Sequence, residues 1–233
     1  MKHFRAILAP PAGAVSFPYG LGRSGLHELA EASYGDRPAM TGFLLAVMRQ
    51  QAKGAWIWVR QSSIARDTGT VPEAALAGSG CHLRLTVQAR TAKEALWATE
   101  EAILSGAASL VIAEIEDADF TATRRLTLAS SHHGVPVVLM LPYTCEGATA
   151  AATRWRVSPR PSATNRYDPH APGHPRWRAV LERCRTAPAV TGQAFDLEWN
   201  DETLSLGVAA GLAAGPPAPR PAAGAPALRR KAG

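Results

Sequence analysis

The sequence predicts an α/β/α sandwich with a mostly parallel central sheet, because short apolar segments alternate with amphipathic ones. Segments such as AWIWVRQ at 55–61 have the length of a strand and are rich in aromatic and β-branched residues. The segments between them repeat apolar residues at helical spacing. VPVVLML at 135–141 is a continuous apolar run, which is typical of a parallel strand buried on both faces.

Each element of the first two thirds is predicted from a local pattern. The helix over 91–105 begins with a T-x-x-E capping box formed by Thr91 and Glu94. In the strand over 82–87, Leu83, Leu85 and Val87 alternate as an inner face would. The expected elements are strands at 26–30, 55–61, 82–87, 109–116 and 135–141, with helices at 38–51, 91–105 and 119–133 and a short one at 72–77.

The last third follows a different pattern. TRWRV at 153–157 predicts a strand, RWRAVLERCR at 176–185 predicts a helix, and FDLEW and TLSLGV predict a closing β-hairpin. From about residue 209 the composition is dominated by Ala, Pro, Gly and basic residues, which cannot bury enough surface to offset the entropy of ordering. We therefore expect an irregular segment at 1–20, one domain at 21–208, and a disordered basic tail at 209–233.

Composition places the chain among ordinary globular proteins. Apolar residues make up 46% and charged residues 19% of the sequence. Cys81, Cys145 and Cys184 lie far apart without a CxxC pair, which argues against a zinc site or a disulfide framework and favours a reducing cytoplasm. No apolar run approaches the roughly 20 residues of a membrane span, and the N-terminus lacks the apolar region of a secretory signal.

Positive charge is concentrated toward the C-terminus. The net charge of the chain is +6, yet the segment 154–185 alone carries eight arginines against Asp168 and Glu182, and the tail adds four further basic residues. Such asymmetry predicts an anionic partner, either a nucleic acid or an acidic protein surface.

Several motifs taken together resemble those of the ImuA family, bacterial proteins associated with translesion DNA synthesis. The likeness covers about residues 20–208 and rests on LWATEEAI, RRLTLA, TRWRV, PRW and LEW, none of which is specific alone. That family is similar to RecA and to the cell-division inhibitor SulA. The resemblance therefore implies a RecA-like α/β/α sandwich with a C-terminal β-hairpin extension.

The resemblance also implies a function. It implies an accessory factor in damage-induced mutagenesis under SOS control. Together with the cysteine pattern above and the turn sequence below, we expect a non-enzymatic cytoplasmic protein without a cofactor. The implied partners are an ImuB-like Y-family polymerase homologue, an error-prone DNA polymerase III alpha subunit, and RecA as target or mimicked protomer. Two alternatives remain open at this point, a divergent RecA-like ATPase and a SulA-like inhibitor of cell division.

The turn after the first strand decides between these readings. A RecA-type ATPase needs GxxxxGK[ST] there, because backbone N–H groups cradle the phosphates while the lysine reaches the β and γ oxygens. The stretch at 30–43, AEASYGDRPAMTGF, has no Gly-Lys-Ser/Thr, and Asp36 adds negative charge that Arg37 only partly compensates. We expect a vestigial nucleotide pocket with no catalytic residue and no metal, whose candidate residues are Gly35, Arg37, Thr41 and Glu114.

Two strand ends support this expectation. Gln61 stands where a RecA-like enzyme offers an acid to polarise the attacking water, and glutamine cannot usefully accept a proton. Glu114 stands where an aspartate would support magnesium, which alone is a tolerable change. Glu114, Glu116 and Asp117 also read as a solvated strand-end loop, and that reading is favoured.

The basic region supplies the candidate partner or DNA surface. In TRWRV the two arginines face one side of the strand and Trp155 faces the other. The competing interpretation is a solvated arginine-rich face with core tryptophans. The candidates are Arg154, Arg156, Arg176, Arg178, Arg229, Arg230 and Lys231.

Three other features favour structural roles. His27 in the first strand reads as a core histidine, and Cys184 beside Arg183 and Arg185 as an inert packed thiol. The pair His132 and His133 precedes Gly134 at a helix end, where histidines commonly meet the helix dipole.

Overall fold

A computed structural model describes residues 25–51, 54–72, 76, 82–185, 187–200 and 205–209. These residues form one sheet in the order β3-β2-β4-β5-β1-β6-β7-β8-β9. The elements are β1 (Gly25–Glu31), α2 (Arg37–Gln51), β2 (Ala55–Gln61), α3 (Ser62–Thr68), β3 (His82–Ala89), α5 (Ala92–Leu104), β4 (Leu110–Glu114), α6 (Phe120–His133), β5 (Pro136–Leu141), β6 (Thr153–Arg160), β7 (Arg176–Cys184), η1 (Pro188–Val190), β8 (Ala194–Asn200) and β9 (Ser205–Val208).

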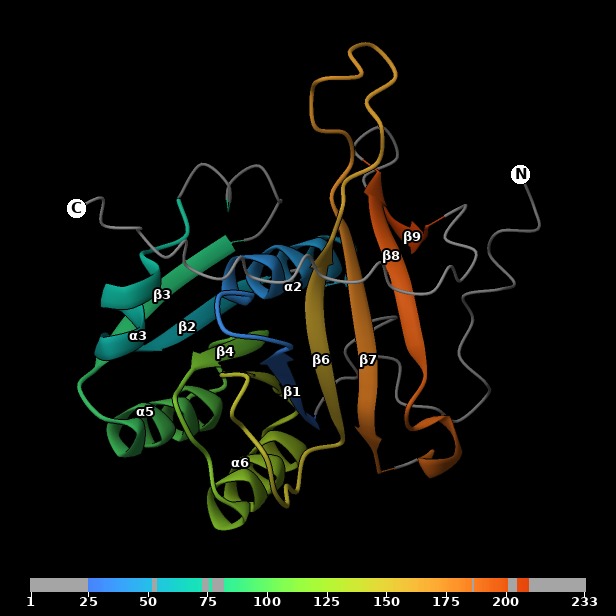
Figure 1. The fold of residues 1–233 in the computed structure, drawn as a ribbon. Coiled ribbons are helices and arrows are strands. Elements are labelled where there is room, and N and C mark those ends of the chain that lie inside the picture. Colours follow the sequence, from blue (N-terminus) through green and yellow to red (C-terminus); the bar gives the residue numbers. More distant parts are fainter. Residues whose placement is uncertain are drawn as a thin grey trace, which may run out of the picture.

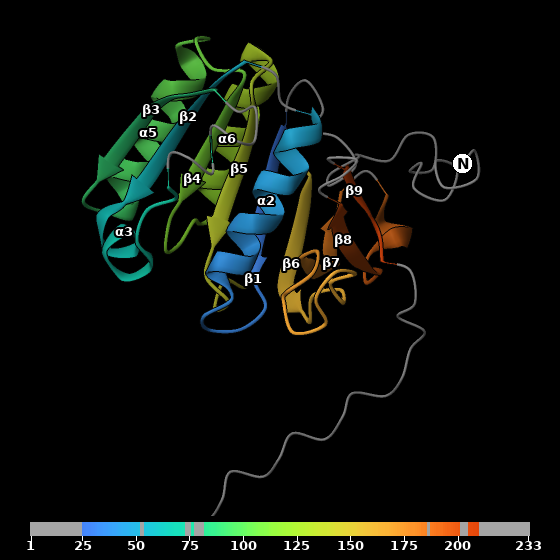
Figure 2. The same cartoon turned by 90° about the horizontal axis from the view of Figure 1, so that it is seen from above.

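The sheet has a parallel and an antiparallel half. Neighbouring strands from β3 to β6 pair in parallel, and β6, β7, β8 and β9 pair antiparallel. Figure 1 shows α2 on one side of the sheet, with α5 and α6 together on the other, and Figure 2 shows the same three layers from above. This confirms the predicted α/β/α class, the mostly parallel sheet and the C-terminal hairpin, here β8 and β9. We call β7, β8 and β9 the antiparallel wing.

Each face of the sheet buries its own apolar cluster. On the α2 side, Phe43 and Val47 of the helix pack with Trp56, Trp155 and Trp177 of the strands. On the other side α5 and α6 cover a second cluster, made largely of small and β-branched residues. Because alternate residues of a strand face opposite sides, β1 and β4 contribute to both clusters.

The helices on the second face are capped as the sequence predicts. The Thr91 hydroxyl oxygen accepts a hydrogen bond from the Glu94 backbone N–H at 3.1 Å, and the Glu94 carboxylate accepts one from the backbone N–H of Arg90 at 2.8 Å. Asp119 caps α6 by accepting from the backbone N–H of Ala122. These bonds satisfy donors that a helix start leaves free, so both helices begin at fixed residues.

The structure corrects two predictions about local structure. Residues 176–185 are not a helix, because Arg176–Cys184 forms β7 between β6 and β8. Leu85 is not on an inner face. It lies in β3, which is at the edge of the sheet and has one neighbouring strand, and its side chain is 52% exposed.

Some predictions fall wholly or largely outside the described residues. These are the irregular segment at 1–20, the short helix at 72–77 except its residues 72 and 76, and the tail apart from its first residue. That residue, Ala209, is buried, and its backbone N–H donates to the carbonyl of Asp196. In the described part of the chain, no helix is long and apolar enough to cross a membrane.

Candidate functional site

Charged side chains gather where the parallel strands end and α2 begins. Glu31 is the last residue of β1, Glu114 is the last of β4, and Arg60 is next to last in β2. Arg37 is the first residue of α2. Open parallel sheets bind their ligands at this edge, so it is the place to look for a nucleotide site.

These four side chains, which we call the strand-end network, neutralise one another. The Nε of Arg37 lies 2.6 Å from Glu31 Oε1, and its Nη1 lies 3.9 Å from Glu114 Oε2. Arg60 donates from Nε and Nη2 to the two oxygens of Glu114, at 2.8 and 3.1 Å. All four side chains are buried, and their formal charges sum to zero. Burial raises the pKa of the Glu31 carboxyl, while the neighbouring Arg37 opposes that rise.

A cavity of about 270 Å³ adjoins this network. Arg37, Thr41 and Glu114 all line it, so three of the four predicted pocket residues do meet at one place. Gly35 is an exposed turn residue with φ of +92°, a conformation that glycine adopts without strain. The cavity is smaller than the roughly 300–1,000 Å³ typical of small-molecule pockets. Its arginines point their charge at carboxylates rather than at a vacant anion site.

Glu114 differs from its predicted setting. The sequence favoured a solvated strand-end loop, but Glu114 is 2% exposed and is held between two arginines. Glu116 and Asp117 are exposed, in agreement with that prediction. The burial of Glu114 could have been predicted from its position in the sequence. Glu114 is the last residue of a continuous apolar strand, whereas Glu116 and Asp117 follow that strand.

The turn between β1 and α2 has few amides to offer a phosphate. The Ala32 N–H donates to the carbonyl of Val157, and the Ser33 N–H donates to the Asp36 carboxylate at 3.0 Å. The Asp36 N–H donates back to the carbonyl of Ser33. Three of the five N–H groups in this turn are therefore engaged within the protein, and the Asp36 carboxylate accepts where a phosphate would.

Gln61 also has a structural partner. Its side-chain oxygen accepts from the backbone N–H of Glu116 at 3.0 Å, which ties the end of β2 to the residue after β4. Its side chain is 4% exposed in this position. The residue at the position expected of a catalytic acid therefore fixes the backbone instead.

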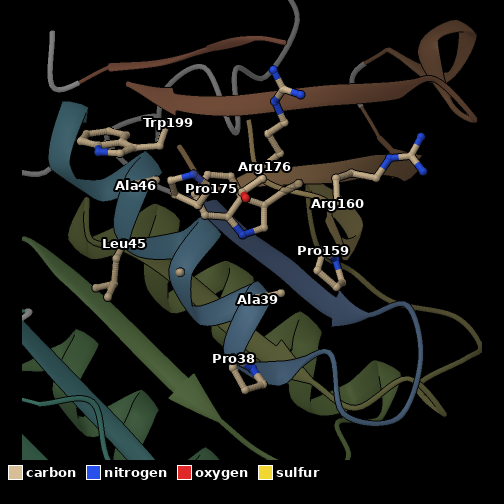
Figure 3. Close-up of a pocket in the computed structure, with 12 residues that line it drawn as sticks. Pro38, Ala39, Leu45, Ala46, Pro159, Arg160, Pro175, Arg176 and Trp199 are labelled. Carbon is tan, nitrogen blue, oxygen red and sulfur yellow. The ribbon is translucent and has the colours of Figure 1, made fainter. Parts of the chain in front are cut away.

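A second cavity lies on the other side of α2 (Figure 3). This α2 groove has a volume of about 490 Å³ and a mainly apolar lining, with Arg160 and Arg176 drawn at its upper edge in the figure. Trp177 packs closely against α2 in this lining, since a Cβ on Gly42 would meet the Trp177 ring at 3.5 Å. The lining residues are Pro38, Ala39, Gly42, Leu45, Ala46, Pro159, Arg160, Ser162, Pro175, Arg176, Trp177 and Trp199.

Comparison with known proteins identifies the family. No family model matches the chain. Protein ImuA from Caulobacter vibrioides, in strain NA1000 / CB15N and in strain ATCC 19089 / CIP 103742 / CB 15, is 31% identical over 185 residues, covering 71% of this chain and 72% of the relative. The chain belongs to the ImuA family. This confirms the resemblance that the sequence motifs gave.

One solved structure that resembles this ImuA-family chain is SulA from Pseudomonas aeruginosa. It shares 16% sequence identity, with a TM-score of 0.40, and the match covers 50% of this chain and 97% of SulA. That likeness is too distant to bear on function.

The structure places the predicted basic surface of this ImuA-family protein differently from the prediction. Arg154 is 6% exposed, and its Nε lies 2.6 Å from Glu28 Oε2, so it is part of the interior and not of a surface. Arg154 lies on the face of β6 opposite to Trp155, where Glu28 of β1 and the carbonyl of Gly147 accept hydrogen bonds from its guanidinium. The predicted alternation itself is confirmed, since Trp155 packs in the α2-side cluster.

Arg156 links β6 to β7, to the end of β1 and to the segment after β5 through hydrogen bonds. Its guanidinium donates to both carboxylate oxygens of Glu182 on β7 and to the backbone carbonyl of Glu31 at the end of β1. It also donates to the carbonyls of Tyr143 and Cys145 after β5. These bonds use most of its donors, so Arg156 joins the two halves of the sheet.

Arg176 and Arg178 lie on β7, not on a helix, and both are partly exposed. Arg176 pairs with Glu198 at 2.6 Å, and Arg178 approaches Asp196 at 3.7 Å. Each arginine thus faces an acid across the strand pair. Their role as a partner or DNA surface stays a prediction, as does that of Arg229, Arg230 and Lys231, which lie outside the described residues.

The remaining candidates have structural settings. His27 is fully buried, with its Nδ1 2.9 Å from the Thr153 hydroxyl, and burial lowers its pKa to about 4. Cys184 is buried in β7, and Cys145 is buried with a pKa that burial raises. Among the described residues, no group of three His, Cys, Asp or Glu side chains could hold a metal ion.

Sequence reasoning missed two parts of these sites. It did not select Arg60, although an arginine near the end of the buried strand AWIWVRQ signals a charged partner at the strand ends. It also missed the α2 groove, because Trp177 and Trp199 come together only through strand pairing.

Proposed function

We propose that this protein is a non-enzymatic, cytoplasmic accessory subunit of a translesion DNA synthesis complex that acts in SOS mutagenesis. It would work through contacts with an ImuB-like protein and an error-prone DNA polymerase III alpha subunit, with RecA as a further partner. Membership of the ImuA family supports a role in translesion synthesis and SOS mutagenesis. The strand-end network supports the non-enzymatic role, because it fills the nucleotide edge of the sheet with carboxylates that already hold the available arginines.

The physical argument concerns charge. A triphosphate with magnesium needs unpaired cations, free backbone N–H groups and an acid that can hold the metal. Here Arg60 and Arg37 are bound to Glu114 and Glu31, and Asp36 accepts from the turn. Arg37 Nη1 is buried without a hydrogen-bond partner, but it lies 3.9 Å from Glu114 Oε2, so its charge also faces a carboxylate. Opening the network for ATP would leave two carboxylates facing the phosphates.

The α2 groove is the partner surface that we propose for the ImuB-like protein. Its lining is mainly apolar, which suits a segment with an apolar anchor, and the arginines at its edge are already paired with Asp196 and Glu198. Trp177 and Trp199 are buried in the lining, so the groove is preformed rather than assembled on binding.

Co-purification with the ImuB-like protein of the same genome tests the proposal. We expect a complex that survives about 0.15 M salt, where the screening length is about 8 Å, because the contact is largely apolar. Ala39→Arg should weaken it at least about tenfold by filling the groove, whereas Tyr167→Arg, on an exposed residue outside the groove lining, should not.

Nucleotide assays separate the rival functions. We expect no ATP hydrolysis above buffer and no change in that level on Glu114→Gln. Turnover that Glu114→Gln abolishes in a folded protein would instead establish a divergent ATPase. Filamentation on overexpression, together with capture of the division-ring protein and not a polymerase, would favour the SulA-like alternative.

A further inference from the structure

The outward side of α5 and α6 exposes large apolar side chains. Trp97 is 62% exposed, Leu104 45% and Leu128 61%. Trp97 and Leu104 are seven residues apart on α5 and so lie on one side of that helix, and Leu128 is three residues after Arg125 on α6. We call Trp97, Glu100, Leu104, Arg125 and Leu128 the outer helix face. Exposed apolar patches of this kind mark interaction sites on soluble proteins.

The outer helix face is grooved along its length. Two cavities, of about 470 and 690 Å³, lie between α5 and α6, and both are lined by Glu100 and Arg125. These two residues form a salt bridge that stands between the cavities. The face therefore has two ends on either side of a central ion pair, and Figures 1 and 2 show the two helices lying side by side there.

The two ends differ in charge. The first cavity is lined by Trp97 together with Asp117, Asp119 and Lys93. The second holds Leu104 and Leu128 with the exposed rings of His132 and His133. The first end is acidic, at the N-terminus of α6, and the second carries histidines at its C-terminus.

A half-turn about the central ion pair makes this face complementary to itself. It would bring Trp97 of one copy over the second cavity of the other, beside Leu104 and Leu128. It would also bring Asp117 and Asp119 opposite His132 and His133. The N-terminus of one α6 would then lie near the C-terminus of the other, an arrangement that helix dipoles favour.

We propose that the outer helix face joins two copies of this chain in a two-fold symmetric dimer. Interfaces of this kind use one patch on both subunits, so the patch must match itself, and here apolar side chains would meet apolar side chains while carboxylates would meet imidazole N–H donors. The α2 groove is lined by residues of α2, which lies on the opposite face of the sheet from α5 and α6 (Figure 2), so dimerisation leaves the groove open. The dimer would then carry two partner grooves.

The mass of the full chain in solution tests the dimer. By light scattering during size-exclusion chromatography, the wild-type chain should have the mass of a dimer. Leu128→Arg should raise the dimer dissociation constant about thirtyfold or more, because it places a charge where apolar side chains of the two copies would meet. Tyr167→Arg, at an exposed site on another part of the molecule, should leave it unchanged. Circular dichroism should show that both variants fold, since both side chains are exposed.

Cross-linking tests the symmetry. A residue near a two-fold axis meets its own copy, so Arg125→Cys, made in a Cys81→Ser background, should form an intersubunit disulfide on mild oxidation. Tyr167→Cys in the same background should not. A wild-type monomer at about 100 µM, a concentration far above typical dimer dissociation constants, would overturn the proposal. So would a dimer that survives Leu128→Arg or that fails to cross-link at Arg125→Cys.

Discussion

Arginine–carboxylate pairs occur both at the strand ends and on the antiparallel wing, but the two regions differ in their access to water. Glu114 bridges Arg37 and Arg60 at 2% exposure. Asp196 bridges Arg160 and Arg178 in a similar arrangement, at 21% exposure. Water can solvate a wing arginine that loses its partner, whereas the side chains of Arg37 and Arg60 are only 8% and 6% exposed and would be poorly hydrated. The loss of stability on breaking a pair therefore depends on how deeply that pair is buried, and the number of pairs says little about it.

The largest effect should come from breaking the buried bridge. Glu114→Ala leaves two buried arginines without their carboxylate, and we expect it to lower the free energy of unfolding by about 3–5 kcal/mol. The matched variant Asp196→Ala should cost less than about 1 kcal/mol. Urea denaturation followed by circular dichroism measures both. Equal losses would show that burial does not separate the two regions.

An intermediate effect should come from acid. Burial lowers the pKa of His27 to about 4 from 6.5, so below pH 6.5 the unfolded chain binds a proton that the folded chain refuses. Stability should therefore fall between pH 6.5 and pH 4, by roughly 3 kcal/mol from this residue, and level off below. His27→Gln should flatten this part of the stability profile. His170→Gln, at an exposed site away from the outer helix face, should leave the slope as in the wild type.

The smallest effect should come from a single pair of the wing. A double-mutant cycle between Arg176 and Glu198 should give a coupling of less than about 1 kcal/mol, because both side chains are partly solvated. The coupling should shrink as salt is raised. A larger, salt-independent value would mean that the wing pairs behave like the buried ones.

Most of the parallel half could be predicted, because its signals are local. The capping residues Thr91 and Asp119, and apolar runs such as 135–141, define their elements without reference to distant parts of the chain. The pocket residues Arg37, Thr41 and Glu114 could be selected because they stand where a RecA-like enzyme has its phosphate loop and its magnesium-supporting acid. Their mutual neutralisation could not, because it depends on side-chain directions.

Residues 176–184 show why the wing was harder to predict. Trp177, Val180, Leu181 and Cys184 recur at helical spacing, while Trp177, Ala179 and Leu181 alternate as a strand requires. Both periods fit, and the partners β6 and β8 decide in favour of the strand. Arg154 illustrates the same limit, because its buried partner Glu28 lies 126 residues away.

The hydrogen bonds of Arg156 couple the position of the antiparallel wing to that of α2. Its guanidinium holds the backbone of Glu31, and the side chain of Glu31 holds Arg37 at the start of α2. The same guanidinium grips Glu182 on the wing. A tilt of the wing would therefore displace the first turn of α2 through this chain of bonds. Because α2 forms one wall of the α2 groove, such a tilt would also change the shape of the groove.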